Sequence, residues 1–149
     1  MRKRSEQFFH DYLRAGSSDT PDHILERLSE SNHSRVRARV AENPKTPTAI
    51  LRLLASDNDV EVRIAVATNP NTPQAIVWQI ANSDSVMVRM ALAVELNTPV
   101  FVLDKLSCDD NPYVAYQAAK TLSIINSFVS QFKRDKDKVM QGSVTSMAS

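Results

Sequence analysis

The sequence predicts an all-α fold, an α-solenoid of four 26-residue two-helix repeats with a capping helix at each end. The first observation is a Thr-Pro pair that recurs every 26 residues, at Thr20-Pro21, Thr46-Pro47, Thr72-Pro73 and Thr98-Pro99. The second is that aliphatic residues recur four, five, eight and sixteen positions after each threonine. The third is a column of small residues twenty-one positions after each threonine, at Ala41, Ala67, Ala93 and Ala119. We number the stretches that begin at each Thr-Pro as units 1 to 4.

Each unit is expected to contain two short antiparallel helices. The threonine should cap the first helix by accepting an amide hydrogen bond, with proline at the first helical position. In unit 2 the polar run 56–59 suits the start of a second helix. Asn69-Pro70 should end that helix, because a residue before proline disfavours the α conformation. Helices this short are marginal alone, so neighbouring units must stabilise one another.

Both ends of the repeat region, residues 20–122, are predicted to be capped. Residues 1–19 should form an N-terminal capping helix, whose apolar face carries Phe8, Phe9, Tyr12 and Leu13. Unit 4 has Thr121-Leu122 where the Asn-Pro stop would stand, so its second helix should extend over residues 123–133 as the C-terminal cap. Residues 134–149 are polar and are predicted to be disordered. About ten helices and no sheet are expected.

Composition restricts the function classes. The 149 residues fit one domain, and 18 Lys and Arg nearly balance 17 Asp and Glu, which gives no general attraction to nucleic acid or membranes. A single cysteine, Cys108, excludes a disulfide framework and a multi-cysteine zinc site. No metal-ligand spacing, nucleophile motif or phosphate loop is present, so no enzyme activity, metal or cofactor is expected. No stretch is apolar enough to cross a membrane, and a cytoplasmic location is expected.

Several stretches of the chain resemble two known repeat families. The stretches Asn43–Pro70 and Asn69–Asn97 follow the pattern Asn-Pro-x-Thr-Pro-x-x-x-Leu, with Val77 at the leucine position of the second, and then Val-Arg; they resemble the leucine-rich repeat variant family. That resemblance implies a right-handed superhelix of short helices and a bacterial protein. The founding type of that family carries an iron–sulfur cluster on an N-terminal cysteine-rich segment, but residues 1–19 contain no cysteine, which excludes such a cluster. The segments 57–67 and 109–122 also resemble HEAT-type repeats of the phycobilisome-lyase kind.

Arginine recurs seventeen positions after the threonine in units 1 to 3, at Arg37, Arg63 and Arg89. The favoured interpretation is a ladder in which each guanidinium bridges a carboxylate and loop carbonyls of the neighbouring unit. The alternative is a basic stripe that binds phosphates. Arg35, Arg37 and Arg39 in unit 1 are the anion-binding candidates.

The second helices change character along the chain at positions fifteen, eighteen and twenty-two of each unit. Unit 1 has Arg35, Ala38 and Glu42 there, whereas units 3 and 4 have mainly apolar or aromatic residues: Met87, Met90, Val94, Tyr113, Tyr116 and Lys120. Trp78 is a further outlier on a first helix. Contiguous exposed apolar surface typically marks an interaction site. The competing interpretation is that the C-terminal helix folds back and covers this face.

The sequence therefore favours a non-enzymatic binding module that docks a protein partner on Trp78, Met87, Met90, Val94, Tyr113 and Tyr116. The first alternative is nucleic-acid or phosphate binding through the basic first unit, helped by Arg2, Lys3 and Arg4. The second alternative follows from the family resemblance and is an accessory subunit of a chromophore lyase. The partner and the oligomeric state are left open.

Overall fold

The structure, a computed structural model, describes residues 2–145, with side chains described for residues 5–136. In this range the chain forms nine helices and no strand. The helices are α1 (Arg2–Ala15), α2 (Asp22–Ser29), α3 (Ser34–Glu42), α4 (Thr48–Leu54), α5 (Val60–Thr68), α6 (Gln74–Ala81), α7 (Val86–Val94), α8 (Val100–Leu106) and α9 (Pro112–Thr145). The all-α prediction is confirmed. The described range holds nine helices against about ten expected, because the second helix of unit 4 and the C-terminal cap form the single helix α9.

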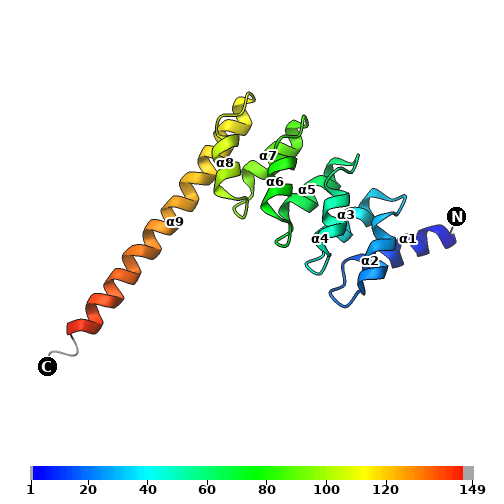
Figure 1. Cartoon of the computed structure of the whole chain (residues 1–149), viewed down its shortest axis with the longest axis horizontal. Helices are drawn as coiled ribbons and strands as arrows, with labels where there is room; N and C mark the ends of the chain where they lie inside the picture. Colours follow the sequence, from blue (N-terminus) through cyan, green and yellow to red (C-terminus); the bar gives the residue numbers. More distant parts are fainter. Residues whose placement is uncertain (1, 146–149) are drawn as a thin grey trace.

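The helices lie in a row along the molecule, and α9 projects from the end opposite α1 (Figure 1). In one series α1, α3, α5, α7 and α9 each contact the next, while α2 contacts α4 and α6 contacts α8. Between α4 and α6 the contact is at most marginal. One apolar core runs between the two series and contains the residues predicted at positions five and sixteen: Leu25, Leu51, Val77, Leu103, Val36, Val62, Val88 and Val114.

The Thr-Pro pairs stand at the starts of the first helices, but the predicted role of the threonine is wrong. α4 begins at Thr48, so Pro47 precedes the first helical residue and the Thr46 side chain accepts no capping bond. Each Thr-Pro threonine instead donates its hydroxyl proton to the carbonyl six residues earlier: Thr20 to Arg14 (2.5 Å), Thr46 to Val40 (2.6 Å), Thr72 to Val66 (2.5 Å) and Thr98 to Leu92 (2.8 Å). Carbonyls in the last turn of a helix lack intrahelical partners. The buried threonine therefore supplies a hydrogen-bond donor to the C-terminal end of the preceding helix and does not cap the following one.

The Asn-Pro pairs end the second helices as predicted, and the asparagine also links neighbouring units. Asn69 is 5% exposed and adopts φ −70° and ψ 129° after the last residue of α5. Its side-chain amide donates to the Ala41 carbonyl (2.6 Å) and the Asn43 carbonyl (2.9 Å) of the preceding unit. Asn43 makes the same two bonds, to Ala15 (2.7 Å) and Ser17 (2.9 Å). We call this link the asparagine bridge.

The asparagine bridge is incomplete after unit 2. Unit 3 has Glu95 at the equivalent position, whose carboxylate accepts from the Asn97 amide (3.1 Å) but has no proton to donate across the boundary. Unit 4 has Thr121, whose hydroxyl donates to the Ala93 carbonyl (2.7 Å) and restores one bond. Within the described side chains, the boundary between α5 and α7 thus has no bond of this kind.

The C-terminal helix differs from the prediction. α9 begins at Pro112 and continues to Thr145, although residues 134–149 were predicted to be disordered. Residues 146–149 lie outside the described range. Because the segment from 113 to 145 contains no proline and a single glycine, Gly142, nothing in its composition breaks a helix.

Candidate protein-binding surface

Helices α7 and α9 carry five of the six predicted partner-binding residues. Val88 and Leu92 of α7 are buried, as are Val114 and Ala118 of α9, and these residues fix which side of each helix faces the core. Side chains that lie about half a turn away from the buried ones must then face outward. α7 packs directly against α9, so the two outward faces adjoin.

The outward face of these two helices is exposed and apolar. The exposed fraction is 63% for Met87, 52% for Val94, 75% for Tyr113 and 69% for Tyr116. Met90 is half-buried and packs against the core beneath them. We call Met87, Met90, Val94, Tyr113 and Tyr116 the α7–α9 surface. The C-terminal helix does not fold back over it, because α9 runs on as one helix away from the row.

Trp78 is not part of the α7–α9 surface. It lies on α6, and its ring stands 5.7 Å from that of Phe101 on α8, with the Lys105 ammonium 5.9 Å from the indole centroid. Trp78 and Phe101 are each 41% exposed. Sequence reasoning missed Phe101, although the signal is present: His23, Ala49 and Ala75 occupy the equivalent position in units 1 to 3.

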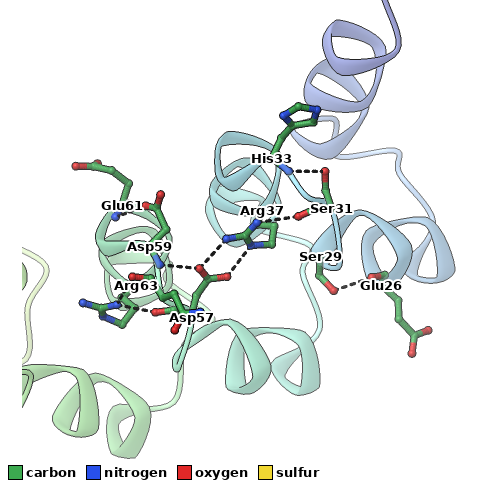
Figure 2. A network of polar contacts seen from close by, with 10 residues as sticks. Glu26, Ser29, Ser31, His33, Arg37, Asp57, Asp59, Glu61 and Arg63 are labelled. Carbon is green, nitrogen blue, oxygen red and sulfur yellow. Dashed lines mark hydrogen bonds and ion pairs between the residues drawn. The ribbon is translucent and has the colours of Figure 1, made fainter. Parts of the chain in front are cut away.

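The three anion-binding candidates of unit 1 point to different places. The guanidinium of Arg37 donates from Nε to Oδ2 of Asp57 (2.7 Å) and from the second terminal nitrogen to Oδ1 (2.8 Å), as Figure 2 shows. Its remaining terminal nitrogen donates to the Ser31 carbonyl (2.7 Å). The hydrogen bond from Arg37 lowers the pKa of the Asp57 carboxyl below its ordinary 3.8 and outweighs the opposing effect of burial. Arg37 is therefore occupied by an ion pair between units.

Arg35 and Arg39 line an open groove between α1 and α3. Tyr12, Glu42 and Glu61 line the same groove. The Arg39 guanidinium lies 5.6 Å from the centroid of the Tyr12 ring and donates to Glu42 (2.8 Å), a contact that raises its pKa. Two carboxylates thus share the groove with the two guanidinium groups, so it is not a purely basic site.

The arginine ladder is present at two of its three predicted positions. Arg89 pairs with Asp109 at 2.7 Å, with side-chain exposures of 15% and 5%. Burial raises the pKa of Asp109, but the hydrogen bond and charge of Arg89 act against it and the net pKa is lowered. Arg63 instead donates to two carbonyls of its own unit, those of Asp57 (2.6 Å) and Asn58 (3.1 Å). The reason is that Ser83 stands where Asp57 and Asp109 stand in units 2 and 4.

No metal site emerges from the described residues. The described part of the chain contains no cluster of three His, Cys, Asp or Glu side chains able to hold a metal ion. His33 packs edge-on against Phe8 with 5.1 Å between ring centroids. Cys108 is exposed and follows Ser107 at the end of α8. Within residues 2–145, none of the helices combines the length and apolar character that crossing a membrane requires.

Comparisons with known proteins give no family assignment: a scan against family models, a search of curated proteins and a search of solved structures each found no match. The resemblance to leucine-rich repeat variant and HEAT-type repeats therefore stays a prediction from the sequence pattern.

Proposed function

We propose that the chain is a right-handed α-solenoid of four units and a non-enzymatic protein-binding module, an adaptor or regulatory scaffold. Its partner would dock on the α7–α9 surface. The observation that carries this proposal is the exposure of Met87, Tyr113 and Tyr116, each more than 60% exposed on two helices in contact.

The chemistry of the surface supports a protein partner. Methionine side chains adapt their shape to a partner, and tyrosine combines a large apolar ring with a hydroxyl that can stay hydrated or bond. Both residue types are enriched at protein interfaces, where a few aromatic anchors tend to dominate the binding energy. Lys120 is the one charged residue at the six outward positions of units 3 and 4, so the expected partner surface is largely apolar.

The test is a binding experiment with a double variant, Met87→Gln with Tyr113→Ser, made in the full chain. Both side chains are exposed, so we expect the melting temperature to be retained. Capture of the specific partner from a lysate of the native host should be lost. The matched control is Glu61→Gln on α5, the equivalent position of unit 2, which should retain capture. Equal capture by all three proteins would refute the proposal.

The other two functions have distinct signatures. Phosphate or nucleic-acid binding would use Arg35 and Arg39 in their groove, and it predicts salt-sensitive retention on a phosphate resin that Arg35→Ala abolishes. The carboxylates of Glu42 and Glu61 in the same groove weaken this alternative. An accessory role in chromophore attachment predicts a bilin-dependent colour on incubation with free bilin.

A further inference from the structure

The polar links between neighbouring units are distributed unevenly along the row of helices. Units 1 and 2 are joined by the ion pair of Arg37 with Asp57 and by the asparagine bridge of Asn69. The side-chain amide of Asn71 adds a hydrogen bond to the Pro44 carbonyl. Each of these contacts joins residues at least 20 positions apart in the sequence, so each holds one unit against the next.

Units 3 and 4 are joined on both sides of the row. The ion pair of Arg89 and the hydrogen bond of Thr121 connect their second helices. Between the first helices α6 and α8, the ring of Trp78 packs beside that of Phe101. The Lys105 ammonium lies over the Trp78 ring and donates to the carbonyl of the last residue of α6 (3.3 Å). These contacts hold α6–α9 together.

Among the described side chains, units 2 and 3 share none of these links. Ser83 stands where a carboxylate would pair with Arg63, and Glu95 stands where an asparagine would donate across the boundary. The Thr72 hydroxyl donates to the Val66 carbonyl, but the threonine of every Thr-Pro pair makes the equivalent bond six residues back. This bond follows the chain around one turn and gives the boundary nothing that the other boundaries lack.

The first helices on the two sides of this boundary are also not tied together. Arg52 of α4 and Ala75 of α6 occupy the positions of Trp78 and Phe101, so no aromatic pair joins these helices. Gln79 occupies the position of the bridging lysine, and its side chain makes no hydrogen bond to α4 among the described residues. The contact between α4 and α6 is at most marginal. What remains is the apolar packing of α5 against α6 and α7.

We propose that the row of helices bends at a joint between α5 and α6, so that α1–α5 and α6–α9 move as two bodies. The chain crosses the joint once, through residues 69–73. Apolar packing is non-directional and tolerates small changes of angle, whereas ion pairs and hydrogen bonds require a defined geometry. The contact of α5 with α7 serves as the pivot, and α4 and α6 are free to approach or separate.

Bending at this joint changes the distance between the two candidate binding regions. Arg35 and Glu61 line the groove between α1 and α3, and Met87 and Tyr113 belong to the α7–α9 surface. All four residues stand fifteen positions after the threonine of their unit, so the two regions lie on the same side of the row. The groove belongs to one body and the α7–α9 surface to the other. A ligand that contacts both regions would therefore fix the angle of the joint.

The test measures the distance between two spin labels in the full chain by pulsed electron paramagnetic resonance, in a Cys108→Ser background diluted with unlabelled protein. The crossing pair is Arg35→Cys with Met87→Cys, which spans α3 to α7. The matched control is Phe9→Cys with Glu61→Cys, which spans α1 to α5 in the same register without crossing the joint. Both pairs should be about 20 Å apart, because packed helices lie about 8–10 Å from one another.

We expect the distance distribution of the crossing pair to be about twice as wide as that of the control pair, because freezing traps the range of hinge angles. The variant Ser83→Asp with Glu95→Asn supplies the missing links and should narrow the crossing distribution to the width of the control. Ser56→Asp adds the same charge one residue out of that register and should leave it wide. Ser83→Asp alone gives the same comparison if the double variant loses its helical circular dichroism.

Two results would overturn the proposal. Equal widths for the crossing and control pairs would mean that the row is uniformly rigid or that bending is spread over all units. A crossing pair that stays wide after the links are supplied would mean that their absence does not create the joint. Neither measurement requires a binding partner, so the outcome is independent of the function proposed for the α7–α9 surface.

Discussion

Arg37 of unit 1 and Asp57 of unit 2 form a two-pronged ion pair whose shortest contact, from Nε to Oδ2, is 2.7 Å. Their side chains are 18% and 9% exposed, so the pair is largely shielded from solvent. Arg89 and Asp109 repeat the arrangement between units 3 and 4. Between units 2 and 3 Ser83 stands where Asp57 and Asp109 stand in units 2 and 4, and Arg63 forms no ion pair with a described side chain. The same boundary lacks the asparagine bridge, because Glu95 replaces asparagine.

Removing the Arg37 side chain should destabilise the fold more than removing that of Arg63. Arg37→Ala leaves the Asp57 carboxylate shielded and unpaired, and we expect a loss of about 2–3 kcal/mol in the free energy of unfolding. Arg63→Ala breaks bonds to two loop carbonyls and should cost about 1 kcal/mol. Urea denaturation measures both. A double-mutant cycle between positions 37 and 57 should give clear coupling, and one between positions 63 and 83 should give none.

The stability of the fold should fall in acid because of these ion pairs. Asp57 has a pKa lowered in the folded state, so its contribution is fully present above its ordinary pKa of 3.8 and is lost as pH falls through the folded value. The difference in unfolding free energy between the native chain and Arg37→Ala should therefore be constant near neutral pH and shrink below about pH 4. Urea titrations from neutral to strongly acidic pH test this. A difference that stays constant throughout would mean that the pair does not stabilise the fold.

Asn69→Ala should be among the most damaging single substitutions at a loop position. The substitution removes the two hydrogen bonds that the Asn69 side chain donates to unit 1. The carbonyls of Ala41 and Asn43 then lack this donor. We expect a loss of about 2–4 kcal/mol in the free energy of unfolding. Asn71→Ala is the control. The side-chain amide of Asn71 donates to the exposed Pro44 carbonyl, so its loss should change the free energy of unfolding little. Comparable losses for both variants would contradict a structural role of the asparagine bridge.

The boundary between α5 and α7 should be the place where the row of helices opens first. It lacks the ion pair and the asparagine bridge, and α4 barely contacts α6. Native-state hydrogen exchange should show that amides on either side of this boundary exchange as two separate groups.

Supplying the ion pair and the asparagine bridge at the boundary between α5 and α7 should stabilise the fold, which tests whether their absence weakens this boundary. Ser83→Asp supplies a carboxylate for Arg63, and Glu95→Asn supplies a donor for the Ala67 carbonyl. The double variant should be stabilised by about 1–2 kcal/mol and should exchange as one group. As a control, Ser56→Asp adds a carboxylate one residue before the position that corresponds to Ser83. It should not increase the free energy of unfolding.

The sequence by itself determined the all-helical character of the fold and the composition of the core. A period of 26 residues in Thr-Pro pairs and aliphatic positions repeats the same local signals in every unit, and these signals depend on nearby residues alone. The exposed positions of Met87, Tyr113 and Tyr116 followed from the same helical periodicity, because a side chain opposite a buried valine must face outward.

The tertiary structure decided which polar groups meet across the units. The hydroxyl of Thr46 could have capped the following helix, but it donates to the preceding one, because the fold brings the Val40 carbonyl in the last turn of α3 within reach. Whether Arg63 pairs with a carboxylate depends on residue 83, twenty positions away, and only the stacking of helices makes these positions neighbours. The path of α9 was also undecided in the sequence, because one apolar stripe suits either folding back on the stack or continuing past it.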